Sequence, residues 1–196
     1  MKKQTNNSLR TVIALTFLTT LLTLAACKEG KEPTPGNSVS QTKAKAPQVD
    51  IHTAVLTGNM EALKQHIAAG SNLNEKDPLG GSSPLISASL FGKTEIAKTL
   101  IDAGADLNFQ NNDGSTALIT ASFFGRPEIV KMLLNKGADK TIKNKYGQTA
   151  FESVSGAFAD VKNVYDALGK MLEPMGLKLD YPYLEKTRPE IAAMLK

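Results

Sequence analysis

The pattern of apolar and polar positions repeats about every 33 residues through the middle of this chain. Residues 82–108 align without a gap on residues 115–141 at an offset of 33, and residues 51–74 align on residues 85–108 at an offset of 34. Each copy holds two short segments whose apolar residues recur at the three-and-four spacing of an amphipathic helix. The pattern therefore predicts an all-α protein built from stacked helix pairs.

Polar residues and glycines separate the helices within each copy. Ser or Thr precedes the first helix as a cap, a glycine follows it where a left-handed residue is favoured, and a glutamate lies in the first turn of the second helix, where its charge suits the helix dipole. These recurring residues are Ser83, Thr116 and Thr149; Gly58, Gly92 and Gly125; and Glu61, Glu95 and Glu128. Turns between copies are expected at "NNDG" (111–114) and "NKYG" (144–147).

A repeat of this length with two helices per copy resembles the ankyrin repeat, whose units are joined by β-hairpin-like loops. The resemblance implies an ankyrin-repeat solenoid. We expect its first repeat, the N-terminal cap, at residues 50–76, its second at residues 77–110 and its third at residues 111–143. The histidine with which the family's first helix bonds to neighbouring loops is kept only at His52.

Residues 144–196 begin like a fourth repeat and then depart from the pattern. The glycine and glutamate of the helix junction are missing, which suggests a first helix extended or reshaped by an insertion. Yet "RPEIAAMLK" at residues 188–196 repeats "RPEIVKMLL" at residues 126–134, at an offset of 62. We therefore expect a degenerate repeat and a helical C-terminal cap, in which residues 188–196 form a second helix that closes the array.

The chain begins with a basic segment, an apolar stretch of 14 residues at positions 11–24, and small residues before Cys27, the only cysteine. The stretch is shorter than the roughly 20 residues that a membrane-spanning helix needs. This plan is typical of a secretory signal peptide, which we place at residues 1–26.

The residues Leu24-Ala25-Ala26-Cys27 resemble the lipobox of bacterial lipoproteins. The resemblance implies that Cys27 becomes the first residue of the mature protein and is lipidated, which anchors the chain to a membrane. In that family an Asp after the cysteine favours the inner membrane, whereas this chain has Lys28. We therefore expect the outer membrane of a Gram-negative bacterium, with the protein facing the periplasm.

Residues 27–49 are rich in proline and lysine and poor in large apolar side chains, so we expect a flexible linker with an average span of about 26 Å. The net charge of +4 arises here and in the leader. Residues 1–26 contribute +3 and residues 27–49 contribute +2, which leaves −1 from residue 50 onward. A domain without excess positive charge argues against nucleic acid as a partner.

The sequence offers no catalytic or metal-binding motif. We expect structural roles for the only histidines, His52 and His66. Residues 106–114 lack the sixth-position glycine and twelfth-position glutamate of a calcium loop. We therefore expect no metal, no cofactor and no enzyme. The alternative is an envelope hydrolase with its site in the irregular region 153–183, where the available acids are Asp160, Asp166, Glu173 and Asp180.

Ankyrin proteins bind partner proteins through the concave side of the array, with turn tips and the exposed ends of the first helices. On this resemblance we predict a surface of apolar anchors ringed by polar residues. Its residues are Leu56, Leu90, Phe91, Phe123, Phe124, Asn112, Asp113, Lys145 and Tyr146. The other possibility is that one residue of each helix-end pair packs against the next repeat. We expect a monomer that binds a protein partner as a scaffold, a stress-related accessory or an immunity protein.

Overall fold

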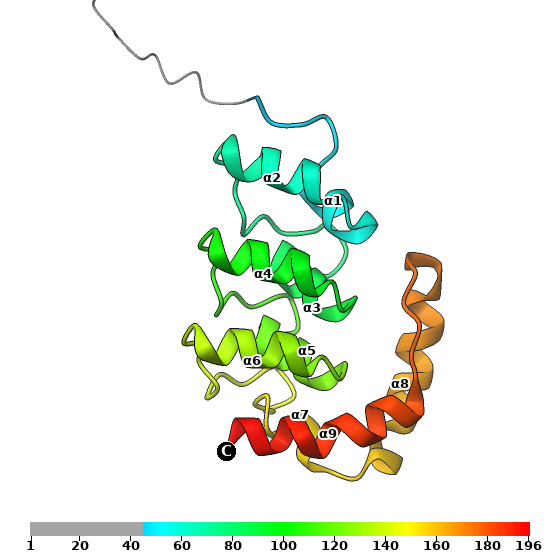
Figure 1. Cartoon of the computed structure of the whole chain (residues 1–196). Coiled ribbons are helices and arrows are strands. Elements are labelled where there is room, and N and C mark those ends of the chain that lie inside the picture. Colours follow the sequence, from blue (N-terminus) through cyan, green and yellow to red (C-terminus); the bar gives the residue numbers. More distant parts are fainter. Residues whose placement is uncertain (1–44) are drawn as a thin grey trace, which may run out of the picture. The chain divides into compact units, whose positions relative to one another are not determined.

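The computed structural model describes residues 45–196, which contain helices and no strand (Figure 1). The expectation of an all-α fold is confirmed. The predicted signal peptide, Cys27 and most of the predicted linker lie outside the described residues. None of the helices in residues 45–196 has the length and apolar character needed to cross a bilayer.

Three helix pairs follow one another in the first part of the described chain. Helix α3 packs against both α1 and α5, and helix α4 packs against α6. The first helices thus form one layer of a stack and the second helices another, as Figure 1 shows. The helices are α1 (Ile51–Thr57), α2 (Met60–Ala68), α3 (Pro84–Leu90), α4 (Thr94–Asp102), α5 (Ala117–Phe123) and α6 (Pro127–Asn135).

Side-chain caps start the first helix of each pair. The carboxylate of Asp50 accepts the N–H of Thr53 at 2.9 Å, and the hydroxyls of Ser83 and Thr116 accept N–H groups of α3 and α5 at 3.3 Å. The Thr149 hydroxyl accepts the N–H of Glu152, the first residue of α7 (Glu152–Ser155), at the same distance, and the Glu152 carboxylate accepts the N–H of Thr149 at 2.7 Å. These reciprocal bonds have the pattern of a capping box and fix the turn that leads into α7.

The core lies between the two helix layers, where the repeated apolar positions of the second helices are buried. Leu100 and Leu133 are fully buried at equivalent positions of α4 and α6. His66 takes this position in α2, where its ring contacts the Val49 carbonyl at 2.7 Å and the Ser71 hydroxyl at 3.0 Å. His66 therefore joins the segment before α1 to the first repeat.

The fourth copy differs from the other three in its helices. Helix α7 has only four residues, so the first helix is shortened, not extended. An inserted helix, α8 (Phe158–Leu172), and a 3-10 turn, η1 (Glu173–Met175), follow before α9 (Tyr181–Leu195). Figure 1 shows α8 to one side of the stack, while α9 packs against both α6 and α7.

Helix α9 contains the repeated segment "RPEIAAMLK" as its second half. Ile191 and Leu195 are buried at the positions of Ile129 and Leu133 in α6. In α6 the proline is the first residue of the helix, whereas Pro189 lies inside α9. An internal proline removes a backbone hydrogen bond, and here Pro189 is exposed, so water can solvate the freed carbonyl. The segment packs as a closing second helix, but helix α9 begins at Tyr181, about two turns before the start at Pro189 that the repeat predicts.

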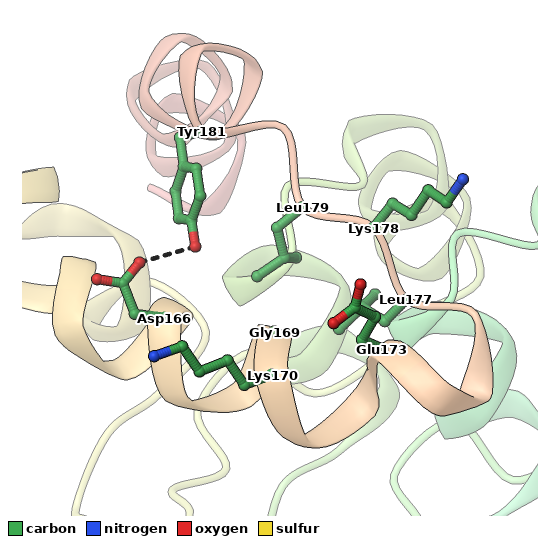
Figure 2. Close-up of a pocket in the computed structure, with 8 residues that line it drawn as sticks. All are labelled: Asp166, Gly169, Lys170, Glu173, Leu177, Lys178, Leu179 and Tyr181. Carbon is green, nitrogen blue, oxygen red and sulfur yellow. Dashed lines mark hydrogen bonds between the residues drawn. The ribbon is translucent and has the colours of Figure 1, made fainter.

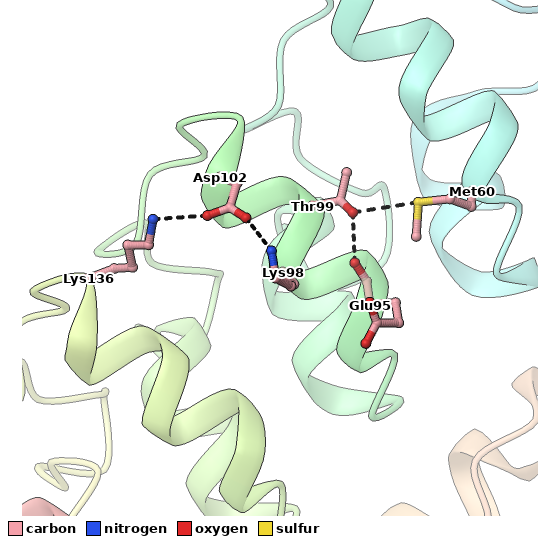
Figure 3. Close-up of polar contacts among 6 residues, drawn as sticks. All are labelled: Met60, Glu95, Lys98, Thr99, Asp102 and Lys136. Atoms are coloured by element: carbon pink, nitrogen blue, oxygen red, sulfur yellow. Dashed lines mark hydrogen bonds and ion pairs between the residues drawn. The ribbon is translucent and has the colours of Figure 1, made fainter.

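Polar contacts connect the second helices of neighbouring repeats. The Asp102 carboxylate of α4 contacts Lys98 Nζ at 2.7 Å and Lys136 Nζ at 2.9 Å, and Thr99 donates to the sulfur of Met60 at 3.6 Å (Figure 3). The two lysines lower the pKa of Asp102 to about 2. All three charged side chains are about half exposed, so water screens the pairs.

We expect the stabilising effect of Asp102 to be present above the ordinary carboxyl pKa and to disappear in acid. The pKa is lower in the folded protein than in the unfolded chain, so this contribution is complete above pH ~4 and is lost as the pH falls toward 2. Carboxyl NMR titration should give a midpoint near 2 that rises in Lys136→Met. An unchanged midpoint in that variant would show that the pair with Lys136 does not form in solution.

Candidate protein-binding surface

Three turns of the same construction connect the helix pairs. Each starts with Asp or Asn, whose side-chain oxygens accept backbone N–H groups further along the turn. Asp77 accepts the N–H groups of Leu79, Gly80 and Ser82. Asn111 accepts those of Asp113 and Ser115, and Asn144 accepts those of Tyr146 and Gln148. The predicted turns at residues 111–114 and 144–147 therefore form, with side-chain bonds that hold their shape.

Asp77 carries a full negative charge in the first of these turns. Partial burial raises the pKa of its carboxyl, but the N–H groups of Gly80, Leu79 and Ser82 outweigh that effect and leave the pKa below its usual value. The carboxylate therefore remains ionised at neutral pH and keeps its three backbone bonds.

Backbone hydrogen bonds connect each turn to the next. Asn112 N–H donates to the Gly80 carbonyl at 2.9 Å, and Lys145 N–H donates to the Asp113 carbonyl at 2.8 Å. The Gln110 amide adds a side-chain bridge to the carbonyls of Gly114 and Lys143. The turns thus form a ladder that fixes their spacing along the stack.

Each turn presents the side chain of the second residue after its Asp or Asn. These three residues are Leu79, Asp113 and Tyr146, which we call the tip row. The first turn has one residue more than the others, so Leu79 lies one residue before Gly80, the ladder counterpart of Asp113. Leu79 is 80% exposed and Tyr146 is 73% exposed, the two largest exposed fractions among the large apolar residues of the described chain. Asp113 is also exposed, as are Asn112 and Lys145. Four of the nine predicted site residues therefore lie on or beside this row.

The side chains at the ends of the first helices are less exposed than those of the turns. Leu56, Leu90 and Phe91 are half-buried. Phe123 stacks on Tyr165 of the inserted helix with ring centroids 4.5 Å apart, so α8 covers one of its faces. Phe124 is only 6% exposed and belongs to the core, because α9 closes over the neighbouring Gly125. The prediction that Phe124 belongs to an exposed binding surface is therefore wrong.

The sequence did not predict a series of hydrogen bonds that joins Arg188 and Tyr165 to the Phe123 carbonyl. In the third repeat Arg126 donates to the Leu90 carbonyl of the preceding repeat at 3.2 Å. At the corresponding place the Phe123 carbonyl accepts from the Tyr165 hydroxyl, which accepts from Arg188 at 3.0 Å. Arg188 aligns with Arg126 in the 62-residue repeat, and that alignment was the one sequence signal for this connection.

The acids considered for a hydrolase do not form one site. Asp166 and Glu173 line a hollow of about 330 Å³ beside Lys170, Lys178 and Tyr181 (Figure 2). Asp180 instead caps α9 by accepting the N–H of Tyr183, and Asp160 is exposed in the first turn of α8.

The Asp166 carboxylate already has hydrogen-bond partners within the protein. It accepts from the Tyr181 hydroxyl at 2.8 Å and pairs with Lys162 at 3.0 Å, and these contacts lower the pKa of Asp166. A lowered pKa makes the carboxylate a weak base and a poor proton donor at neutral pH. Asp166 is therefore poorly suited to act as the acid or base of a hydrolase.

Neither histidine has the surroundings of a metal ligand. His66 is engaged with the Val49 carbonyl and Ser71, and the ring nitrogens of His52 are buried without a hydrogen-bond partner. His52 therefore does not make the loop contact that the family resemblance implied. Within residues 45–196 no three His, Cys, Asp or Glu side chains group so that they could hold a metal ion.

Comparison with known proteins identifies the repeats. The family described as "Ankyrin repeats (3 copies)" matches residues 51–144. The ankyrin repeat domain of Bcl-3, a member of the IkappaB protein family, superimposes with a TM-score of 0.51 at 32% identity, over 53% of this chain and 45% of that one. Residues 51–144 are therefore ankyrin repeats, and the fold is an ankyrin-repeat solenoid.

Curated relatives match about a third of this chain. Human "DNA-binding protein RFXANK" is 39% identical over 71 residues, 36% of this chain and 27% of the relative. Human "Protein phosphatase 1 regulatory subunit 27" is 39% identical over 64 residues, 33% of this chain and 41% of the relative. The chain thus spans less than half the length of these relatives.

Proposed function

We propose that this ankyrin-repeat chain is a non-enzymatic module of the bacterial cell envelope that holds a partner protein against its tip row. The exposed Leu79 and Tyr146 on a hydrogen-bonded ladder are the observation that carries this proposal. Large apolar side chains on a backbone that is already ordered can bind with little loss of conformational entropy. The asparagine, aspartate and lysine between them supply a polar rim.

The name of one relative supports this proposal. This relative is called a regulatory subunit of protein phosphatase 1, and it matches 33% of this chain. The roles proposed for such a module are a scaffold, a stress-related accessory and an immunity protein. Crosslinking in intact cells followed by mass spectrometry would identify the partner.

The tip row is tested by replacing its exposed apolar residues. We expect Tyr146→Asp and Leu79→Asp each to weaken capture of the crosslinked partner at least tenfold, because a charge would be placed in a desolvated contact. Stability should change little, since both side chains are mostly in water. Met171→Asp is the matched control, because Met171 is 63% exposed on α8, outside the tip row. Equal losses in all three variants would contradict the assignment.

The proposed location rests on the lipobox-like residues before Cys27. We expect Cys27→Ser to remain uncleaved or to leave the outer-membrane fraction, because the thiol that carries the lipid is missing. Membrane fractionation and palmitate labelling measure this directly. Unchanged labelling and fractionation of the variant would overturn the lipid anchor.

The hydrolase remains the alternative from another class, and Asp166 and Glu173 are the acids that share a hollow. Saturable binding without turnover supports the binding module. An envelope hydrolytic activity that is lost in Asp166→Asn and Glu173→Gln, with folding intact, would support the enzyme instead.

A further inference from the structure

The ladder of turns is closed at its first end. The second and third turns each donate to the preceding turn from the residue that follows the Asn, which is Asn112 or Lys145. The first turn has one residue more than the others, so Pro78 and Leu79 together take the place of that donor. Proline has no N–H, and the Leu79 N–H already donates to the Asp77 carboxylate at 2.8 Å, so the first turn has no free donor here. A second copy therefore cannot extend the ladder by docking its first turn onto the last one.

The other end of the ladder has an unused acceptor. The turn at residues 144–148 makes the same internal backbone bond as the turn at residues 111–115, since Asn144 N–H donates to Gln148 and Asn111 N–H donates to Ser115. The Tyr146 carbonyl therefore corresponds to the Asp113 carbonyl, which accepts from the next turn. Within residues 45–196 the Tyr146 carbonyl accepts no backbone hydrogen bond.

The packing around two equivalent glycines shows the same open end. A methyl group placed on Gly114 would lie 3.2 Å from the nitrogen of Lys145 and 3.3 Å from the Cα of Asn144, because the next turn packs over it. Gly147 has the same φ of 74°, but nothing lies within 4 Å of the corresponding point. The space that a backbone fills over Gly114 is thus free over Gly147.

A hollow of about 490 Å³ lies beside this free end. Phe151 and Leu195 form its apolar floor, and Lys143 and Lys196 form a basic rim. Lys140 also lines the hollow, but its Nζ already donates to the carbonyls of Leu195 and Lys196, at 3.2 and 3.0 Å. Lys143 faces one carboxylate, that of Glu152 at 3.6 Å, and both side chains are about half exposed. The last unit of a repeat array normally presents a polar outer face to water. An apolar floor with a basic rim is instead suited to an acidic chain that carries apolar side chains.

We propose that this open end is a second binding site, which takes an acidic, extended segment of a partner polypeptide. A backbone N–H of the segment donates to the Tyr146 carbonyl, and its backbone packs over Gly147 as the third turn packs over Gly114. An apolar side chain enters the hollow against Phe151, while carboxylates meet the lysine rim. The site uses the backbone of the last turn and the end of α9, not the side chains of the tip row.

The test uses the full chain and a fluorescein-labelled, capped octapeptide of alternating Glu and Leu. Fluorescence anisotropy should show saturable binding below 1 mM. The matching Lys–Leu octapeptide should bind at least tenfold more weakly, because it reverses every charge. An acidic octapeptide methylated at every backbone nitrogen should bind at least fivefold more weakly, because it lacks the N–H donors.

Two substitutions locate the site on the protein. Lys143→Glu should weaken binding of the acidic peptide about tenfold, while Lys64→Glu, the same charge change at an exposed position of α2, leaves it unchanged. Gly147→Asn should also weaken it about tenfold by filling the free space, and asparagine tolerates the left-handed backbone. Gly137→Asn, another positive-φ glycine with open space around it, is the matched control. Urea unfolding confirms that each variant folds.

The outcomes are decisive in both directions. A benzophenone group on the peptide should crosslink to residues 143–151 or to the end of α9. Equal affinity for the acidic and basic peptides, binding unaffected by Lys143→Glu and Gly147→Asn, crosslinks to the first-helix ends, or no saturable binding would each overturn this site. Leu79→Asp should leave peptide binding unchanged, so failure of this site and failure of the tip row are distinguishable.

Discussion

Replacing Arg188 with methionine should lower the free energy of unfolding by about 3 kcal/mol. Arg188 is 2% exposed, and its guanidinium donates to the carbonyls of Ser153 and Gly156 and to the Tyr165 hydroxyl, at 3.0–3.2 Å. No carboxylate of residues 45–196 pairs with it, so these three oxygens are what stabilise its charge. Methionine fills similar space but leaves the oxygens without their donor.

The expected loss reflects three bonds to a charged donor, reduced because a buried cation no longer has to be desolvated. Urea unfolding at pH 7 measures this loss, and an unchanged m-value shows that wild type and Arg188→Met unfold in the same way. Arg188→Lys keeps the charge but cannot reach all three oxygens, so it should fall between wild type and Arg188→Met. A loss below about 1 kcal/mol in Arg188→Met would show that water replaces the guanidinium.

Tyr165→Phe separates the hydroxyl from the stacked ring. The variant keeps the stack on Phe123 but removes the bonds to the Phe123 carbonyl and Arg188, so we expect it to cost about 1–2 kcal/mol. Because Tyr165 and Arg188 share a bond, the double variant should be less destabilised than the sum of the two single variants. Strict additivity would contradict a direct connection.

Replacing Gly125 with alanine should lower the free energy of unfolding by about 2–4 kcal/mol. The residue has a φ of 63°, where a side chain costs roughly 1–2 kcal/mol. Its methyl group would also lie 2.8 Å from a Leu184 methyl and 2.9 Å from the Thr187 hydroxyl of α9, and overpacking a core typically costs about 1–3 kcal/mol. Either α9 must shift or the backbone must relax.

Gly137→Ala is the matched control for this prediction. Gly137 has a φ of 85°, but nothing lies within 4 Å of the position of an added methyl group. Its loss should therefore be limited to the backbone contribution of roughly 1–2 kcal/mol. Thermal unfolding of both variants measures the difference. Equal losses would indicate that α9 does not pack on the third repeat in solution.

The repeated helices could be predicted from the sequence because their signals are local. Ser83 and Thr116 cap their helices, Glu95 and Glu128 lie in the first turns of theirs, and Pro127 begins α6. Each of these effects acts within one or two helical turns, so the pattern of a single copy is enough to place the helix. The turns followed in the same way from Asn111 and Asn144.

The candidate site was predicted in part for the same reason. Asp113, Lys145 and Tyr146 belong to turns whose own residues fix the shape, and all three are exposed. Phe123 and Phe124 lie at a helix end whose environment depends on residues 40 to 60 positions later. Tyr165 stacks on Phe123, and Leu184 and Thr187 close over Gly125. No local pattern near Phe124 carries that information.

The sequence by itself determined the period, the helix pairs and the turns of this protein, because capping, helix periodicity and turn chemistry act between neighbours in the chain. Only the tertiary structure decided how the fourth copy closes the array. Helix α7 is short, α8 is inserted, and Arg188 reaches back to Ser153 and Tyr165. These contacts join residues far apart in sequence, and their free energy depends on burial that no single repeat can provide.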